Sequence, residues 1–379
     1  MTRSRSHEAG SARRWLRPSL HWLLVFIPVA LWVEHASPES HVLIFASACL
    51  AIVPLAGLLG LATEHLATRA GEGVGGFLNA TFGNLAELII AVVALQAGHA
   101  EVVKASLTGS IIGNVLLVLG AAFLAGGLKH PVQRFKAAGA LAQTSTLSVA
   151  AFAFIIPAGF HALVRGEMSA AQEHRMSLGI AVVLLAVYLF GLLFSLKTHR
   201  ALFTAERCDE ELLEHTPGGA HWGVGRSVGV LLGVSALIAW MSEILVGAIE
   251  PAAQEFGLTK VFIGVFVVAI VGNAAEHTTA ISVALKDRMD LSLSIAFGSS
   301  VQVALFVAPV LVLCSLVFGP HPLDFALPPG LVLIVLLSVL ITGQVAGDGR
   351  SDWLKGVQLL AVYLVLGLTF FFMPSTTTH

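Results

Sequence analysis

The sequence predicts an all-α membrane protein of about eleven transmembrane helices, with one N-terminal helix followed by two inverted-topology five-helix repeats. The chain of 379 residues is 56% hydrophobic and only 12% charged, with a mean hydropathy of +0.86. Soluble domains carry about 25% charged residues, so this composition indicates an integral membrane protein. Runs of about 20 apolar residues recur along the chain. One polar motif occurs twice inside such runs, about half the chain apart.

Each apolar run is long enough to cross a membrane as a helix. The runs cover residues 19–36, 41–66, 75–97, 102–126, 138–160, 176–196, 225–250, 259–285, 290–317, 326–345 and 353–373. The predicted organisation is a tail at 1–18, an extra N-terminal span at 19–36, a first five-helix repeat at 41–196, an acidic loop at 197–224 and a second five-helix repeat at 225–373.

The basic residues predict the orientation of the chain. With the N-terminus placed inside, 17 of the 21 lysines and arginines fall on the inside, and only Lys104, Arg165, Arg175 and Lys260 fall outside. We therefore expect a multi-pass protein of the cell inner (plasma) membrane, embedded in the lipid bilayer, with the tail and the acidic loop in the cytoplasm. We interpret Lys104, Arg165 and Lys260 as interfacial anchors.

Several functional classes are excluded or disfavoured. No basic block indicates nucleic acid, and the three separated cysteines form no C-x-x-C pair that would indicate a disulfide framework or a thiolate metal site. A membrane metallohydrolase would need H-E-x-x-H, but Glu64-His65 and Glu276-His277 have no second histidine in register. We predict a transporter without a cofactor and no enzyme activity. Whether the protein forms a homo-oligomer is left open by the sequence.

The repeated motif is Gly-Asn-x-x-Glu. It occurs as Gly83-Asn84 with Glu87 and again as Gly272-Asn273 with Glu276, which lies 189 residues (276 − 87) after Glu87. A charge at the bilayer centre costs about 2.5–3.5 kcal/mol on insertion scales, so two at equivalent positions need a functional reason. Five spans per repeat invert the second repeat relative to the first, which is typical of secondary transporters with a site near the midplane. We expect each glycine to allow either a kink in its span or a close approach to a neighbouring helix.

Two more spans contribute oxygen atoms near the motif. Ser110 and Asn114 lie one turn apart in the run 102–126, and Ser299 and Gln302 lie one turn apart in the run 290–317, where Asn114 aligns with Gln302. The predicted metal ligands are therefore Glu87, Glu276, Asn84, Asn273, Asn114, Gln302, Ser110 and Ser299. Ca²⁺ takes six to eight oxygen ligands in flexible geometry, whereas zinc and copper favour nitrogen or sulfur.

Proton coupling would use the same two glutamates. Close, buried carboxylates repel each other and are expected to hold protons until a divalent cation displaces them, so one site would bind either Ca²⁺ or H⁺. His277 points about 100° around the helix from Glu276 and is predicted to serve a proton path. Glu64 and Glu243 are candidates for gating or access. The acidic-loop residues Glu206, Asp209, Glu210, Glu211 and Glu214 are candidates for regulation.

Four stretches resemble the calcium/cation–proton exchanger (CAX) family of the cation/Ca²⁺ exchanger superfamily. They read "NATFGNLAELI", "GSIIGNVLLVLG", "VGNAAEHTTA" and "AFGSSVQVALFVAP", and the resemblance covers about residues 41–373. It implies Ca²⁺/H⁺ antiport, with Glu87, Glu276 and His277 matching the signature residues of the family. Leu85-Ala86 departs from the small residue or proline of many members. A sodium- or monovalent-cation-coupled exchanger is the alternative, but two site carboxylates suit one Ca²⁺ against about two protons better.

Overall fold

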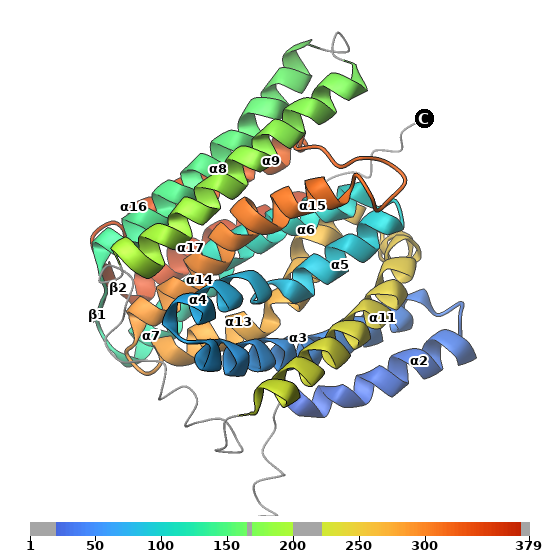
Figure 1. The fold of residues 1–379 in the computed structure, drawn as a ribbon, viewed down its shortest axis with the longest axis horizontal. Helices are drawn as coiled ribbons and strands as arrows, with labels where there is room; N and C mark the ends of the chain where they lie inside the picture. The colour runs from blue at the N-terminus through green and yellow to red at the C-terminus, as the bar shows by residue number, and fades with distance from the viewer. Residues whose placement is uncertain (1–19, 165–168, 200–221, 373–379) are drawn as a thin grey trace, which may run out of the picture.

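The computed structural model describes residues 20–164, 169–199 and 222–372, which form a bundle of helices (Figure 1). In this part of the chain ten helices are long and apolar enough to cross a membrane. The first five are α3 (His41–Ala70); α4 (Glu72–Phe82) with α5 (Leu85–Gln96); α6 (Ala100–Ile112) with η2 (Gly113–Val118) and α7 (Leu119–Lys129); α8 (Ala137–Val164); and α9 (Ala170–Leu193) with η3 (Phe194–Thr198). The all-α membrane class is confirmed.

The second five helices follow the acidic segment. They are α11 (Val224–Phe256); α12 (Lys260–Phe262) with η5 (Ile263–Val268) and α13 (Ala269–Ala284); α14 (Met289–Gln302) with η6 (Val303–Val307) and α15 (Ala308–Cys314); α16 (Pro329–Ala346); and α17 (Trp353–Phe371). The predicted N-terminal span is described from η1 (Leu20–Val25) through α2 (Phe26–Ala36), and its apolar helix Trp22–Ala36 is shorter than the other ten. The 1–18 tail and the five acidic-loop candidates lie outside the described residues.

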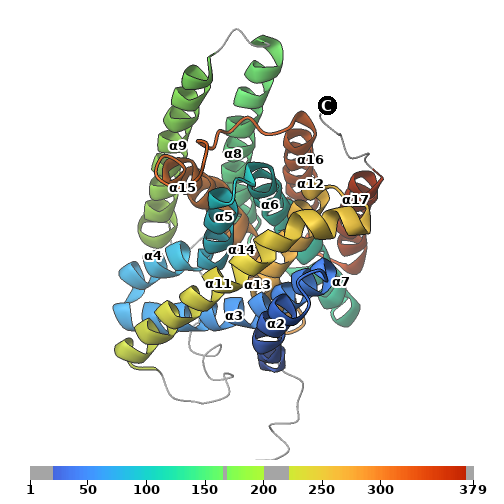
Figure 2. The same cartoon turned by 90° about the vertical axis from the view of Figure 1, so that its right-hand side faces the viewer.

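The most buried helices lie at the centre of the bundle. They are the spans 100–129 and 289–314, and α13 packs beside both of them. The long helices α3 and α11 pack along one another on one side, next to α2, as both views show (Figures 1 and 2). On the opposite side lie α8 and α9, where the C-terminal end of α8 and the N-terminal end of α9 project beyond the other helices (Figure 2). The polar repeat motifs lie on inner helices, away from these projecting ends.

The span that carries the first motif is broken. Helix α4 ends at Phe82, and Asn84 has a φ of −99° and a ψ of 22°, outside helical geometry, before α5 begins at Leu85. At Gly272 there is no break, because α13 runs through it and the Asn273 side chain donates to the Ala269 carbonyl within the same helix at 2.9 Å. The irregularity in that span lies earlier, in the π-helical segment η5. Such segments are frequent at functional sites.

Equivalent glycines of the two repeats meet different neighbours. At Gly109 in α6 a Cβ would collide with the backbone of Val265, whereas at its counterpart Gly298 in α14 nothing lies within 4 Å of that position. Likewise Gly264 packs against Ala105 of α6, but its counterpart Gly75 packs against the backbone of Ala67 in α3. The first half of the span 260–284 thus lies on α6, while the equivalent α4 lies on α3 and not on α14.

The loops on the predicted cytoplasmic side fasten the repeats together. Strand β1 (Gln133–Arg134) pairs antiparallel with β2 (Arg350–Ser351). The Gln133 amide also donates to Asp287 at 2.8 Å and to the Ala284 carbonyl at 2.9 Å. Lys355 donates to Asp348 at 2.6 Å, and this hydrogen bond holds the pKa of the Asp348 carboxyl below its ordinary value. These contacts join three loops from both halves of the chain.

Candidate cation site

The two motif glutamates come together at the centre of the bundle. Glu87 lies in the first turn of α5, just after the break, and Glu276 lies within α13. Their carboxylates interact electrostatically, so the structure brings these two predicted ligands together. Oε1 of Glu87 and Oε2 of Glu276 are buried and have no hydrogen-bond donor among the described residues. Two buried carboxylates with unpaired oxygens need either protons or a cation as partners.

Neutral oxygens and amides surround this pair. The Asn273 amide donates to the Ser110 hydroxyl at 3.0 Å, and the Ser299 hydroxyl donates to the Asn84 side-chain oxygen at 3.1 Å. Glu87 interacts with Asn273 and Ser110, and Glu276 interacts with Ser299. All four neutral residues are buried. Each half of the chain therefore supplies an asparagine, a serine and a glutamate, and the serine of one half contacts the asparagine of the other.

These contacts identify equivalent residues in the two repeats. Asn84 and Asn273 are 189 positions apart, and so are Ser110 and Ser299, so the serines are the equivalent pair. The predicted alignment of Asn114 with Gln302 has a separation of 188 (302 − 114), one less than that of the serines, and the two side chains have different partners. Asn114 donates to Ser299 at 3.0 Å, whereas Gln302 accepts a hydrogen bond from Asn84. Both residues still belong to the polar cluster.

Glycine makes room for one of the carboxylates. A Cβ at Gly272 would lie 3.0 Å from Cγ of Glu87, so any other residue at this position would push the glutamate side chain away from α13. At the equivalent Gly83 a Cβ would lie 2.7 Å from the carbonyl oxygen of Asn79 and 3.6 Å from Oε1 of Gln302. The glycines that precede the asparagines thus have different roles, close helix approach at Gly272 and a tight helix end at Gly83.

The side chains of this site suit a hard cation that prefers oxygen ligands. Within the described residues no group of three or more His, Cys, Asp or Glu side chains could hold a metal ion. The site offers two carboxylates and otherwise amide and hydroxyl oxygens, which fits the oxygen preference and flexible geometry of Ca²⁺.

The other predicted residues lie around this cluster. Glu64 is half-buried on α3 and Glu243 is exposed on α11. These two helices pack together; α3 also contacts α13, and α11 also contacts α5. His277 is half-buried on α13 beside Glu276. Their gating and proton-path roles stay predictions, and so do the regulatory roles of Glu206, Asp209, Glu210, Glu211 and Glu214, outside the described part.

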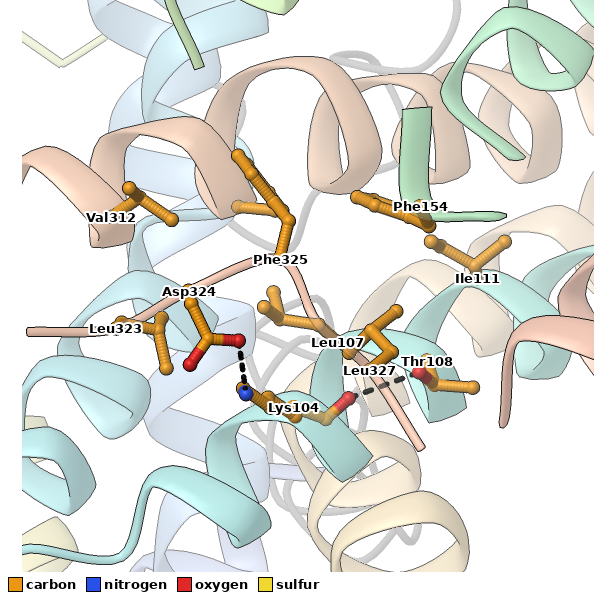
Figure 3. A pocket seen from close by; sticks show the side chains of 11 residues that line it. Lys104, Leu107, Thr108, Ile111, Phe154, Val312, Leu323, Asp324, Phe325 and Leu327 are labelled. Atoms are coloured by element: carbon orange, nitrogen blue, oxygen red, sulfur yellow. Dashed lines mark hydrogen bonds and ion pairs between the residues drawn. The ribbon is translucent and has the colours of Figure 1, made fainter. Parts of the chain in front are cut away.

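One predicted anchor has a different role. Lys104 on α6 binds Asp324 at 2.7 Å and the Ala326 carbonyl at 3.0 Å, in a partly buried ion pair beside a small pocket (Figure 3). It therefore fixes the connection between α15 and α16, in contrast with the more exposed pair of Lys260 and Glu250 at 2.8 Å. The sequence carries no signal for this pairing, because the partners are 220 residues apart.

Sequence reasoning also missed Tyr188. Its hydroxyl, on α9, donates to the carbonyl of Ala80 in α4 at 2.9 Å. The only signal was a tyrosine within an apolar run, since the chain has two tyrosines in all. A tyrosine there is ordinarily interpreted as packing or as an interfacial anchor.

The chain has relatives over nearly its whole length. The family described as sodium/calcium exchanger protein matches residues 40–197 and 226–372. The Ca(2+)/H(+) antiporter of Aphanothece halophytica is 43% identical over 360 residues, which cover 93% of this chain and 96% of that protein. The Ca(2+)/H(+) antiporter ChaA of Bacillus subtilis is 41% identical over 332 residues, covering 87% of this chain and 92% of that protein.

Solved structures share the fold. Native YfkE superposes with a TM-score of 0.79 at 36% identity and covers 94% of this chain and 100% of its own. The H⁺/Ca²⁺ exchanger CAX superposes with a TM-score of 0.72 at 15% identity, over 94% of this chain and 88% of its own, and this likeness supports the fold alone.

Proposed function

The chain belongs to the sodium/calcium exchanger protein family, and on this basis we propose that it is a secondary antiporter that exchanges Ca²⁺ for H⁺ across a membrane. The single observation that carries this function at the level of residues is the carboxylate pair. Glu87 and Glu276 interact electrostatically inside the bundle, and each keeps one buried oxygen without a hydrogen-bond donor in the described part.

The exchange follows from competition for these oxygens. Ca²⁺ as substrate is held by Glu87 and Glu276, with neutral oxygens from Asn84, Asn273, Asn114, Gln302, Ser110 and Ser299 completing its shell. When Ca²⁺ leaves, the two carboxylates take protons, because uncompensated charges in a low-dielectric site are unfavourable. The site then returns loaded with protons to the other face, so Ca²⁺ and H⁺ move in opposite directions.

Residues on the helices around the site control the access of ions to it. Glu64 and Glu243 gather the cation at its entrance, and His277 passes protons to and from Glu276. The orientation keeps the N-terminus and the acidic loop in the cytoplasm of a cell whose plasma membrane holds the protein, since basic residues concentrate on that side.

The test is Ca²⁺ uptake into sealed proteoliposomes with an acidic interior. Glu87→Gln and Glu276→Gln keep the side-chain shape but remove the charge that offsets Ca²⁺ and the group that returns the proton, so each is expected to abolish uptake. Glu101→Gln, a change of an exposed glutamate at the start of α6, serves as the control and should exchange normally.

Two outcomes would overturn this proposal. If either glutamine variant exchanged Ca²⁺ for protons at nearly the wild-type rate, that glutamate would be structural. If wild-type uptake followed an imposed Na⁺ or K⁺ gradient and ignored the pH gradient, the monovalent-coupled alternative would replace proton coupling.

A further inference from the structure

The break in the span that carries Glu87 frees a backbone carbonyl. In a continuous helix the carbonyl of Ala80 would accept from the amide of residue 84, but the chain leaves helical geometry at Asn84. At the equivalent place in the other repeat, the carbonyl of Ala269 accepts from the side chain of Asn273 at 2.9 Å. The Asn84 side chain instead donates to Gln302. Ala80 thus needs another donor, since an unpaired buried carbonyl is costly.

Tyr188 supplies this donor. Its hydroxyl reaches the Ala80 carbonyl at 2.9 Å, and its side chain is buried with only 4% of its surface exposed. The ring stacks on Phe306 of η6, with centroids 5.2 Å apart. The tyrosine therefore joins α9, the broken span and the span that carries Ser299 and Gln302.

We propose that Tyr188 is a positioning residue for exchange, whose hydroxyl stabilises the broken form of the Glu87 span and releases the Ala80 carbonyl when that span straightens. The proposal rests on the exchange function above. The α12–α13 span gives the form expected after release, because there the asparagine satisfies the carbonyl within its own helix. In the straightened span the Asn84 side chain would leave Gln302, and both its amide and the backbone amide of Asn84 would donate to the Ala80 carbonyl. These two donors would fill both lone pairs of the carbonyl oxygen and displace the hydroxyl of Tyr188.

Tyr188→Phe removes the hydroxyl and keeps the ring on Phe306. Losing one hydrogen bond from one conformer alone shifts the balance between the two forms by about 2- to 10-fold. The ratio of the apparent Ca²⁺ affinities on the two membrane faces reports this balance, because each affinity scales with the fraction of protein open to that face. We expect this ratio, measured in right-side-out and everted vesicles, to change by that factor.

Tyr363→Phe is the matched control. Tyr363 is the other tyrosine of the chain, it is buried on α17, and its hydroxyl has no hydrogen-bond partner in the described part. Its loss should leave the ratio of affinities unchanged. An unchanged ratio in Tyr188→Phe, or an equal change in both variants, would overturn the proposal. Wild-type exchange in the same vesicles tests the proposed function separately.

A second measurement needs no transport. Biosynthetic 3-fluorotyrosine gives two ¹⁹F resonances in the full chain, and Tyr363→Phe assigns them. We expect the Tyr188 resonance to divide between two environments whose ratio changes with Ca²⁺ and pH. A single Tyr188 resonance that ignores both ligands would contradict release of the Ala80 carbonyl, whatever the transport assay gives.

Discussion

The neutral ligands around the two glutamates are expected to matter less than the glutamates themselves. Asn273→Ala, Asn84→Ala and Gln302→Ala each remove a neutral oxygen and its hydrogen bonds, a loss of about 0.5–1.5 kcal/mol or roughly 2- to 12-fold in Ca²⁺ affinity. Isothermal titration calorimetry measures this change, with the exposed Thr278→Ala on α13 as the control. Complete loss of Ca²⁺ binding in these variants would show that the amides organise the site rather than merely add ligands.

The glutamates and asparagines could be predicted because a carboxylate inside a membrane span is costly, and the motif that contains both residue types recurs after 189 residues. Ser110 and Ser299 were identified as ligands, but their equivalence needed the cross-contacts to Asn273 and Asn84. The sequence signal of Tyr188, a tyrosine within an apolar run, does not reveal its role, because that role depends on a carbonyl freed 108 residues earlier in the chain. Residues that act through distant backbone groups are therefore beyond periodicity and motif arguments.

At the scale of elements, the connection between α15 and α16 depends on Lys104. Its ion pair with Asp324 leaves the lysine side chain 15% exposed, whereas Lys260, paired with Glu250, is 37% exposed. We expect Lys104→Met to lower stability by about 1–3 kcal/mol, because it removes the cation beside the partly buried Asp324 carboxylate and the donor to the Ala326 carbonyl. Lys260→Met should cost at most about 1 kcal/mol.

A thermal unfolding series in detergent checks this difference between the two ion pairs. The double variant Lys104→Met with Asp324→Leu should recover part of the loss, since no charge is then left unpaired. Equal midpoints for Lys104→Met and Lys260→Met would mean that the connection does not rely on the partly buried pair.

The apolar runs predicted the ten long helices, because a segment that crosses a membrane must form its backbone hydrogen bonds internally and therefore folds as a helix. They did not predict where helices are interrupted. The break at Asn84 and the smooth passage through Gly272 come from the same motif, and the difference lies in packing, with α4 against α3 and the segment 260–268 against α6. Local sequence cannot distinguish the two outcomes, since both halves carry the same glycine and asparagine.

At the scale of the whole molecule, proton competition predicts a pH dependence. Because Ca²⁺ and two protons compete for Glu87 and Glu276, Ca²⁺ affinity should fall as the pH is lowered, by up to about 100-fold per pH unit where both protons are displaced. Calorimetry in buffers of different ionisation enthalpy counts the protons released. We expect two per Ca²⁺ at the acidic end and fewer in Glu87→Gln. An affinity independent of pH would contradict a shared site.

The open space beside Gly298 has a consequence for how sequence tolerance is measured. Here a Cβ at Gly298 would meet nothing within 4 Å, whereas a Cβ at its counterpart Gly109 would collide with the backbone of Val265. In a transporter whose two halves exchange conformations, a position that is free in one state is filled in the other. Thermal stability assays of variants in a single state would therefore classify Gly298 as permissive, while selection for growth would not. One conformation therefore shows only some of the contacts that limit which residues such a chain accepts.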